Sequence, residues 1–465
     1  MQTGRNAPGP LHVAVVGSGP SGFYAAEALL RSEADVRISM IERLPTPYGL
    51  VRSGVAPDHP NLKQPMIVYD RIARTEGFSF LGNVMIGRDV TVDELLATHH
   101  AVVMACGAQV DKRMGIPGED LRGSHTATEF VGWYNGHPDH RDRTFDLSQE
   151  VAVIVGQGNV AADVCRILAK PVDELRQSDI SAHAIEVLAE SKIREFYVVG
   201  RRGPAQAKFT SKELRELGSV TDCVAVANAD ECILNEQCEK ELAERSNMNA
   251  TKNMELFRRF ADQIASDARR RITFRFFASP KELVGQERVE KIVLTRNRLE
   301  GIAFSQVARP SGETEEIDCG LVFRSIGYRG VPISGLPFDE DRSVLPNKVG
   351  RILEGDRPLP GLYVTGWLKR GPSGIIGTNR ADSMETVENL LADFPSLTAD
   401  PKPGVGGLQQ LLEERGVRSV NLSDWINIDS AEVERGKKEG KPREKFTRID
   451  DMLNVLVDIT CPVRV

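Results

Sequence analysis

The chain has 465 residues, of which 41% are hydrophobic and 27% are charged, and its formal net charge is −7 at pH 7. The length indicates two or three domains, and the composition excludes a disordered chain and an integral membrane protein. Because the chain is acidic and its apolar runs are only strand-sized, we expect neither a nucleic-acid partner nor a membrane span.

The seven cysteines are scattered along the chain without any C-x-x-C pair. This pattern suits a reducing compartment and disfavours a redox-active dithiol, an iron–sulfur cluster or a structural zinc ion in this chain. The N-terminal MQTGRNAPGP lacks the apolar stretch of a signal peptide. We expect a cytoplasmic, monomeric protein without a metal site.

Strand-like and helix-like segments alternate through the first two hundred residues, as in a parallel sheet with crossover helices. The predicted elements are a strand at 12–17, a helix at 20–32 and a strand at 36–42, and then the same plan at 151–156, 159–169 and 195–200. Residues 170–193 look like a helical insertion in the second unit. A buried strand is predicted within 99–109, and the stretch from there to about 150 is expected to be irregular.

The later part of the chain has a different pattern. One helix of mixed charge is predicted at about 237–267, followed by the β-rich segments of an antiparallel excursion. The segment 319–330, CGLVFRSIGYRG, repeats the strand-into-glycine pattern of 99–109, so we interpret the two as paired crossings between domains. The last hundred residues contain the glycine-rich GPSGIIGTN and then helical, polar sequence.

The first unit carries the dinucleotide fingerprint VGSGPSG. Gly17 permits a tight turn, Gly19 lets the backbone approach a pyrophosphate, and Gly22 lets helix and strand pack closely. The pyrophosphate is then expected at the helix N-terminus. Glu42 ends the next strand, where a carboxylate binds ribose hydroxyls and repels a 2′-phosphate. This site is therefore predicted to bind FAD or NAD.

The second unit, VGQGNVAAD, has Gly156 and Gly158 but carries Ala161 where a third glycine is usual. Its next strand ends immediately before Arg201 and Arg202, whose guanidinium groups suit a 2′-phosphate. The arginines lie about twice the usual distance from the glycines, which the helical insertion explains. The Ala161 methyl group is expected to shift the helix slightly outward. With an NADP site and an FAD site on one chain, a hydride can pass between them.

These stretches resemble ferredoxin-NADP+ reductases of the adrenodoxin reductase type. The resemblance extends over about residues 13–385 and is most specific in PTPYGLVRSGVAPDHP, with further matches in GQGNVAADVCRIL, VVGRRGPAQAKFTSKELREL and GWLKRGPSGIIGTNRADS. It implies an α/β fold with two Rossmann-like domains, the NADP domain (109–326) being inserted into an FAD domain (1–108 and 327–465, the latter with a C-terminal helical region).

The resemblance also implies the cofactor contacts. Those for FAD are Gly17, Gly19, Ser21, Glu42, Leu50, Val84, Trp367, Gly374, Ile375 and Ile376, and those for NADP are Gln157, Gly158, Asn159, Val160, Arg201, Arg202, Glu213 and Gly374. A cationic NADP contact falls near Lys112. From the residues alone, Trp367 could be ordinary core and Glu213 a solvated helix residue.

The implied function is transfer of a hydride from NADPH to FAD and of single electrons to a ferredoxin. His59 and Asp163 are the candidate catalytic residues, although His59 could be a hydrogen-bonded loop residue and Asp163 could merely favour the helix dipole. An acidic ferredoxin would dock on a basic patch. Its candidate residues are Arg215, Arg258, Arg259, Arg269, Arg270 and Arg271, which as charge runs could also be solvated surface. The alternatives are a flavin module that feeds another redox enzyme and a non-catalytic NADP(H) sensor.

Overall fold

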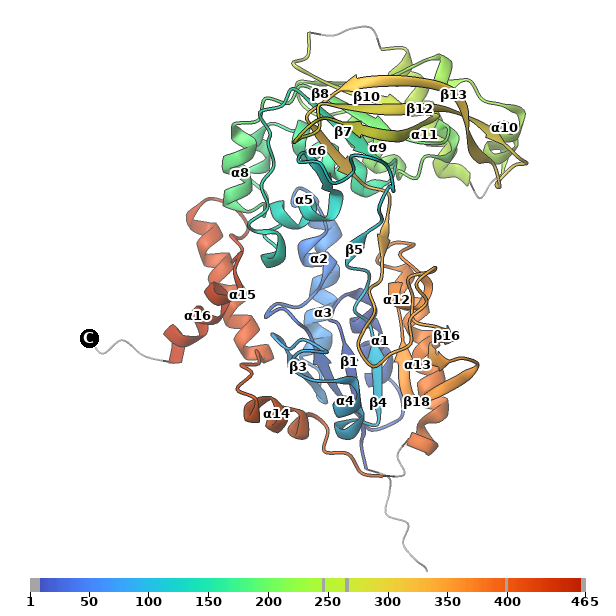
Figure 1. Cartoon of the computed structure of the whole chain (residues 1–465). Helices are drawn as coiled ribbons and strands as arrows, with labels where there is room; N and C mark the ends of the chain where they lie inside the picture. Colours follow the sequence, from blue (N-terminus) through green and yellow to red (C-terminus); the bar gives the residue numbers. More distant parts are fainter. Residues whose placement is uncertain (1–8, 245–246, 264–266, 398–399, 461–465) are drawn as a thin grey trace, which may run out of the picture.

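The computed structural model of the chain describes residues 9–244, 247–263, 267–397 and 400–460 (Figure 1). The strands are β1 (Leu11–Val16), β2 (Val36–Ile41), β3 (Phe78–Leu81), β4 (Ala101–Met104), β5 (Val110–Asp111), β6 (Ser124–Thr126), β7 (Val151–Val155), β8 (Glu195–Val199), β9 (Cys223–Ala227), β10 (Arg270–Arg275), β11 (Ala278–Val284), β12 (Lys291–Glu300), β13 (Val307–Asp318), β14 (Leu321–Arg324), β15 (Tyr328–Arg329), β16 (Asn347–Lys348), β17 (Arg351–Glu354) and β18 (Arg357–Val364).

The helices are α1 (Pro20–Leu30), α2 (Leu50–Ser53), α3 (Pro65–Ala73), α4 (Val92–Thr98), α5 (Ala127–Tyr134), α6 (Asn159–Ala169), α7 (Val172–Leu175), α8 (Ala182–Ala189), α9 (Ser211–Leu217), α10 (Glu236–Ala243), α11 (Met248–Ala261), α12 (Trp367–Arg370), α13 (Thr378–Leu397), α14 (Val405–Glu414), α15 (Leu422–Lys438) and α16 (Ile449–Thr460). Short 3-10 turns lie at Pro60–Lys63, Pro138–His140, Pro204–Gln206 and Asp230–Cys232. None of the helices in the described part of the chain is both long and apolar enough to cross a lipid bilayer.

The first domain is built on a seven-stranded sheet with the order β16-β17-β18-β4-β1-β2-β3. Strand β1 pairs in parallel with β2 and β4, while β16, β17 and β18 pair with one another antiparallel. Alternate residues of β1 enter different cores: Val13 and Val15 pack on one face, and Ala14 and Val16 on the other. Because both faces are buried, the strand is apolar at every position except His12 rather than alternating.

The second domain is inserted in the chain between β4 and β16 of the first. Its six-stranded sheet has the order β6-β14-β7-β8-β10-β9, and every pairing in it is parallel. Strand β7 again divides its residues between two cores, Ala152 and Ile154 on one face and Val153 and Val155 on the other. An antiparallel sheet of β11, β12 and β13 lies on this domain (Figure 1). The predicted pair of Rossmann-like domains, one inserted into the other, is therefore confirmed.

The two crossings between the domains run side by side, as predicted. Strand β5 leaves the first sheet and pairs antiparallel with β15, which returns to it; Tyr328 lies opposite Asp111 and Arg329 opposite Val110. Figure 1 shows this ribbon between the two domains. The exact boundaries at 108/109 and 326/327 stay predictions.

Two predictions about helices are wrong. The single helix expected at 237–267 is instead two helices, α10 and α11, and α11 ends at Ala261. The stretch up to 150, expected to be irregular, contains α5. A capping box starts this helix, with Thr126 and Glu129 each bonding the other's backbone N–H. This T-x-x-E signal was available in the sequence, but the surrounding glycines and prolines obscured it. The helical insertion at 170–193 is confirmed by α7 and α8.

The two fingerprints differ in the space available at their last position. A Cβ atom at Gly22 would lie 2.0 Å from the Gly17 carbonyl oxygen, so no side chain fits there without a shift. Ala161, at the same place in the second unit, is fully buried in the core with its methyl group accommodated. The outward shift of α6 stays a prediction.

Candidate cofactor-binding and hydride-transfer site

A large cavity, of about 2660 Å³, is lined by residues of both domains. Every predicted catalytic and cofactor-contacting residue lines it: Gly17, Gly19, Ser21, Glu42, Leu50, His59, Val84, Gln157, Gly158, Asn159, Val160, Asp163, Arg201, Arg202, Glu213, Trp367, Gly374, Ile375 and Ile376. Lys112 lines it as well. Residues that lie hundreds of positions apart in the sequence therefore face one space.

At the first fingerprint, the start of α1 is open to this cavity. Its N-cap, Gly19, makes no side-chain cap, and a Cβ atom there would meet no protein atom within 4 Å. Free N–H groups beside empty space suit a pyrophosphate. Glu42 accepts hydrogen bonds from the Ser18 hydroxyl at 2.6 Å and from the backbone N–H of Ser18 and Leu44 at 3.1 and 3.2 Å. These bonds hold the carboxylate at the strand end, where ribose hydroxyls are expected.

The second fingerprint is open in the same way. Gly158 caps α6 without a side-chain bond, and a Cβ atom there would also meet no protein atom within 4 Å. The flanking side chains form hydrogen bonds within the protein. Gln157 donates to the carbonyl of Arg275 at 3.1 Å, and Asn159 accepts from the N–H of Thr210 at 2.8 Å. The backbone of this turn is therefore the part left to contact a ligand.

Arg201 and Arg202 follow β8 directly. Arg201 is exposed and Arg202 half-buried, and within the described ranges neither makes an ion pair with a carboxylate of the protein. Partial burial, and then the charge of Arg201, lower the pKa of Arg202. Two unpaired cations at this strand end suit a doubly charged 2′-phosphate. The exposed Lys208 also lines the cavity, and sequence reasoning missed it.

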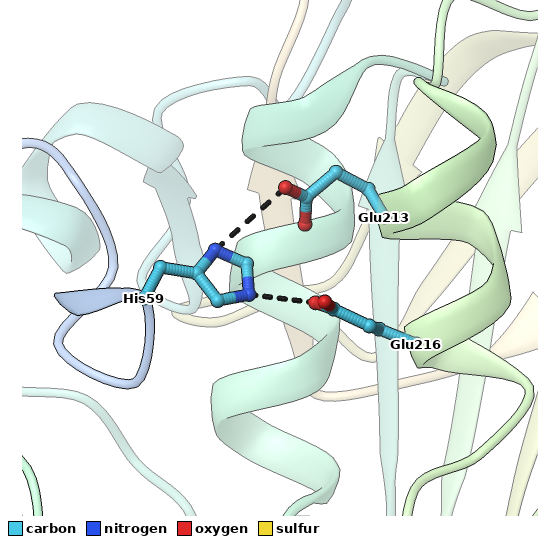
Figure 2. A group of neighbouring side chains, drawn as sticks. All are labelled: His59, Glu213 and Glu216. Carbon is cyan, nitrogen blue, oxygen red and sulfur yellow. Dashed lines mark hydrogen bonds and ion pairs between the residues drawn. The ribbon is translucent and has the colours of Figure 1, made fainter. Parts of the chain in front are cut away.

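His59 lies between two carboxylates of α9 (Figure 2). Its Nε2 is 2.6 Å from Glu216 Oε2, and its Nδ1 is 3.7 Å from Glu213 Oε1 and 3.9 Å from Asp163 Oδ1. The predicted pair His59 and Asp163 is thus brought together at the junction of the two domains. Asp163 is the fifth residue of α6, and the first turn of this helix holds no acidic residue. The alternative interpretation, that Asp163 merely favours the helix dipole from the first turn, is therefore wrong.

Arg166 is the residue at this junction that sequence reasoning missed. Its buried guanidinium binds Asp58 at 2.9 and 3.0 Å, Asp163 at 2.7 Å and Glu213 at 3.1 Å. Lys170, which directly follows α6, adds a bond of 2.9 Å to Asp58. The only signal for this cluster was the D-x-x-R spacing on α6, which places Asp163 and Arg166 on one helix face.

His59, Glu213 and Glu216 could offer three metal ligands, since one ligand atom from each lies within 4.8 Å of the others. The arrangement suits hydrogen bonding better. His59 Nε2 is already bonded to Glu216, and the Arg166 guanidinium lies 3.4 Å from Nδ1 while pairing with Glu213. A cation here would have to compete with that positive charge.

Trp367 begins α12 at the edge of the cavity. Its ring stacks on Tyr328 with a centroid distance of 5.4 Å, and its indole N–H donates to the carbonyl of Ser373 at 3.2 Å. The side chain is half-buried, so it is not ordinary core. Gly374 has a φ of +84°, a conformation that glycine adopts without strain. The glycine-rich turn thus lies directly beside the ring stack.

Comparison with known proteins matches residues 11–197 to the pyridine nucleotide-disulphide oxidoreductase family model. The chain is 45% identical to the mitochondrial NADPH:adrenodoxin oxidoreductase of Salvelinus fontinalis, over 95% of this chain and 90% of that protein. It is 42% identical to the NADPH-ferredoxin reductase FprA of Mycobacterium leprae, over 96% and 98%. The solved structure of Mycobacterium tuberculosis FprA in complex with NADPH matches with a TM-score of 0.91 and 40% identity, over 97% and 100%.

The chain belongs to the adrenodoxin reductase and FprA family of NADPH-ferredoxin reductases. FAD and NADP(H) are therefore its cofactors, and the two open helix starts described above fit their pyrophosphates. This membership makes the first domain the FAD domain and the inserted one the NADP domain. The ion cluster of Asp58 and Arg166 joins these two domains.

The carboxyl groups of this cluster differ in acidity. Burial raises the pKa of Asp163, and burial together with the charge of Asp163 raises that of Glu213. Burial alone would also raise the pKa of Asp58, but the bonds and charges of Arg166 and Lys170 outweigh it and lower that pKa well below its usual value. The reductase therefore keeps Asp58 ionised while Asp163 and Glu213 hold protons more readily.

We predict that Asp58→Asn costs about 2–4 kcal/mol of unfolding free energy at pH 7, because it leaves the buried Arg166 undercompensated. A lowered carboxyl pKa stabilises the fold above the unfolded value near 4, and that stabilisation is lost as the pH falls. The difference between wild type and variant should thus be constant above about pH 5 and shrink as the pH falls from about 4.5 toward 2.5, as measured by urea unfolding. Asp173→Asn, at a side chain 99% exposed, is the control. A difference that does not change with pH would contradict this assignment.

Proposed function

We infer that this protein passes a hydride from NADPH to FAD and then single electrons to a ferredoxin-type iron–sulfur protein. The observation that carries this conclusion is one cavity that joins two open helix starts, with Glu42 at one and Arg201 and Arg202 at the other. When bound, FAD supplies hydride acceptance and the release of electrons one at a time. Relatives that match over nearly their whole length favour the reductase over an electron-input module or a sensor.

We propose a division of labour among the lining residues. The α1 start and Glu42 bind FAD, and Leu50, Val84 and the turn Gly374 to Ile376 enclose it. Residues Gln157 to Val160 bind the NADP pyrophosphate, while Arg201 and Arg202 bind the 2′-phosphate and Glu213 contacts the same cofactor. Lys208 adds positive charge near this end. The ring stack of Trp367 on Tyr328 excludes water where the two domains meet.

The arginine pair gives the sharpest test. Wild-type protein should be yellow and should be bleached by NADPH much faster than by NADH. Arg201→Ala and Arg202→Ala should each lower kcat/KM for NADPH about tenfold to a hundredfold, because each removes charge-assisted bonds to the 2′-phosphate. The values for NADH should change less than threefold. Arg357→Ala, at a side chain 86% exposed in β18, is the control.

A colourless protein after careful purification would contradict the flavoenzyme assignment. Equal losses with NADPH and NADH in the arginine variants would instead contradict the role of the pair in recognising the 2′-phosphate.

We propose that His59 and Asp163 act at the reacting end of the site. His59 is held on Nε2 by Glu216, and Asp163 is held by Arg166, so neither depends on a mobile water for its orientation. With Glu213, they form a group that can hold a proton beside the reacting rings. Such a group tunes the rate without supplying an essential acid or base.

His59→Ala and Asp163→Asn are each expected to slow flavin reduction by NADPH about threefold to thirtyfold, as followed by stopped-flow absorbance. Binding of NADP+, measured by titration, should stay within threefold of wild type because the phosphate contacts remain. Rates within twofold of wild type across pH 6–9 in both variants would show that neither residue takes part.

We propose that the iron–sulfur partner docks on arginines of the NADP domain. Helices α9 and α11 pack against each other, and Arg215, Arg258 and Arg259 project from them into solvent, with Arg269 also exposed. Arg270 and Arg271 lie half-buried on β10, and Arg270 donates to the carbonyl of Ala169 at 3.1 Å. The docking surface is therefore best assigned to the four exposed arginines.

Arg259→Glu should slow reduction of an acidic ferredoxin about threefold to tenfold at low salt, and the difference should shrink as salt is raised. Arg259 is preferred to Arg215, which neighbours Glu216 in α9. Reduction of ferricyanide, which needs no docking surface, should not change, and Arg357→Glu is the matched control. A wild-type rate independent of salt would contradict electrostatic docking.

We also propose that the protein works as a cytoplasmic monomer. Six cysteines in the described part of the chain are free thiols, which suits a reducing compartment, and Cys461 lies outside the described residues.

A further inference from the structure

The C-terminal helical region, for which the sequence indicated no role, connects the two domains. In Figure 1, α15 and α16 lie beside the FAD domain and below α8 of the NADP domain, away from the β5 crossing. We call residues 439–448, between these two helices, the interdomain segment. This segment therefore attaches the NADP domain to the FAD domain in addition to the β5–β15 ribbon and the Asp58–Arg166 cluster.

The interdomain segment is anchored to the FAD domain by the buried carboxylate of Glu432. Arg52 of α2 binds Glu432 at 2.5 Å, and Arg443 binds it at 3.0 Å. The N–H of Phe446 donates to the same carboxylate at 3.0 Å. The Arg52 guanidinium also lies over the Trp425 ring, 5.2 Å from its centroid. Arg443 and Phe446 of the segment are therefore linked, through Glu432, to helix α2, which precedes Asp58 and His59 in the chain.

The same segment also contacts the NADP domain near the start of α8. Lys441 Nζ donates to the carbonyl of Ile180 at 3.0 Å, and the N–H of Ala182 donates to Glu444 at 3.2 Å. Arg141 donates to the Thr447 hydroxyl at 3.1 Å. These contacts lie outside the cofactor phosphate sites, so their purpose is not to bind NADP.

Asp179 is the point at which three parts of the chain meet. Lys63 of the FAD domain binds it at 2.6 and 2.7 Å, and Lys445 of the interdomain segment binds it at 3.1 Å. The side chains of Lys63 and Lys445 are only 7% and 2% exposed. Removing one partner of a buried charge cluster leaves charge without compensation, so such a cluster tolerates one geometry.

We propose that Lys445, together with Lys63 and Asp179, positions the NADP domain for hydride transfer by holding the two domains at one angle. Lys445 borders the cavity, but its ammonium group binds Asp179, so it acts as a positioning residue. The ribbon of β5 and β15 pairs only two residues on each strand, so by itself it cannot fix that angle. A displacement of about 1 Å at the reacting atoms is enough to slow a reaction about a hundredfold.

The charge of this cluster changes in an accessible pH range. The pKa of Lys445 is lowered to about 7. Burial is the main cause, and the charges of Lys63 and Arg52 act in the same direction, whereas Asp179 opposes them. Asn135 also faces the ammonium group, with its Oδ1 at 3.5 Å. At pH 6 Lys445 is therefore mostly charged and binds Asp179 as an ion pair, whereas at pH 8.5 it is mostly neutral.

The test is Lys445→Met, compared with the exposed Lys438→Met as control. Stopped-flow reduction of the flavin by NADPH should be about tenfold slower than wild type at pH 6 and within about twofold at pH 8.5, where wild type has also lost the charge. The affinity of Lys445→Met for NADP+ should stay within threefold of wild type. The long-wavelength absorbance of its complex with NADPH should be weaker than that of the wild-type complex at pH 6. Lys438→Met should match wild type at both pH values.

A milder variant covers the case in which Lys445→Met does not fold. Thr447→Val removes only the bond from Arg141 and should slow flavin reduction about twofold to threefold. The proposal is overturned if Lys445→Met is as fast as wild type at pH 6, if its deficit is the same at both pH values, or if Thr447→Val alone folds and has no effect. The positioning proposal rests on the proposed hydride transfer from NADPH to FAD. A wild-type protein that NADPH does not bleach would refute the hydride transfer itself, so the two failures can be told apart.

Discussion

The buried pairing of Asp58 with Arg166 is the interaction on which the arrangement of the site depends. Arg166 belongs to α6, the helix whose N-terminus we propose as the NADP phosphate site, and Asp58 belongs to the FAD-domain loop that carries His59. One rigid helix therefore runs from the phosphate contact to the domain junction. Any rotation of α6 relative to the FAD domain would break the two bonds of 2.9 and 3.0 Å and leave buried charge unpaired.

The same guanidinium sets the charge balance around His59. It pairs with Asp58, Asp163 and Glu213, so negative charge exceeds positive charge near the imidazole ring, and burial is the main cause of the raised pKa values of Asp163 and Glu213. Helix α9 holds Glu213 and Glu216 toward His59, because residues three apart share a helix face. Arg215 lies between them in sequence and projects from another face of the helix into solvent. One short helix thus contributes both to the junction and to the proposed docking surface.

The cofactor ends of the site could be predicted from sequence because each depends on local chain geometry. A strand, a glycine turn and a helix place the phosphate contact, and the end of the next strand places Glu42 or the arginine pair, whatever the rest of the chain does. Asp58 and Arg166 are separated by 108 residues, and Arg52 and Glu432 by 380. No periodicity or spacing reports such pairs. They arise only when two domains and a C-terminal segment are packed together, which is why Asp58, Arg166 and the interdomain segment were missed.

The final residues of the two fingerprints, Gly22 and Ala161, differ in how they pack. At Gly22 the turn closes on itself, and the Gly17 carbonyl oxygen occupies the volume that a methyl group would need. In the second unit the corresponding volume is free, and Ala161 fills it with a fully buried methyl group. We propose that the choice between FAD and NADP belongs instead to Glu42, held in place by Ser18, and to Arg201 and Arg202, left unpaired by the protein. On this proposal the fold contains two copies of one phosphate site, and the residues that follow the next strand of each copy select its cofactor.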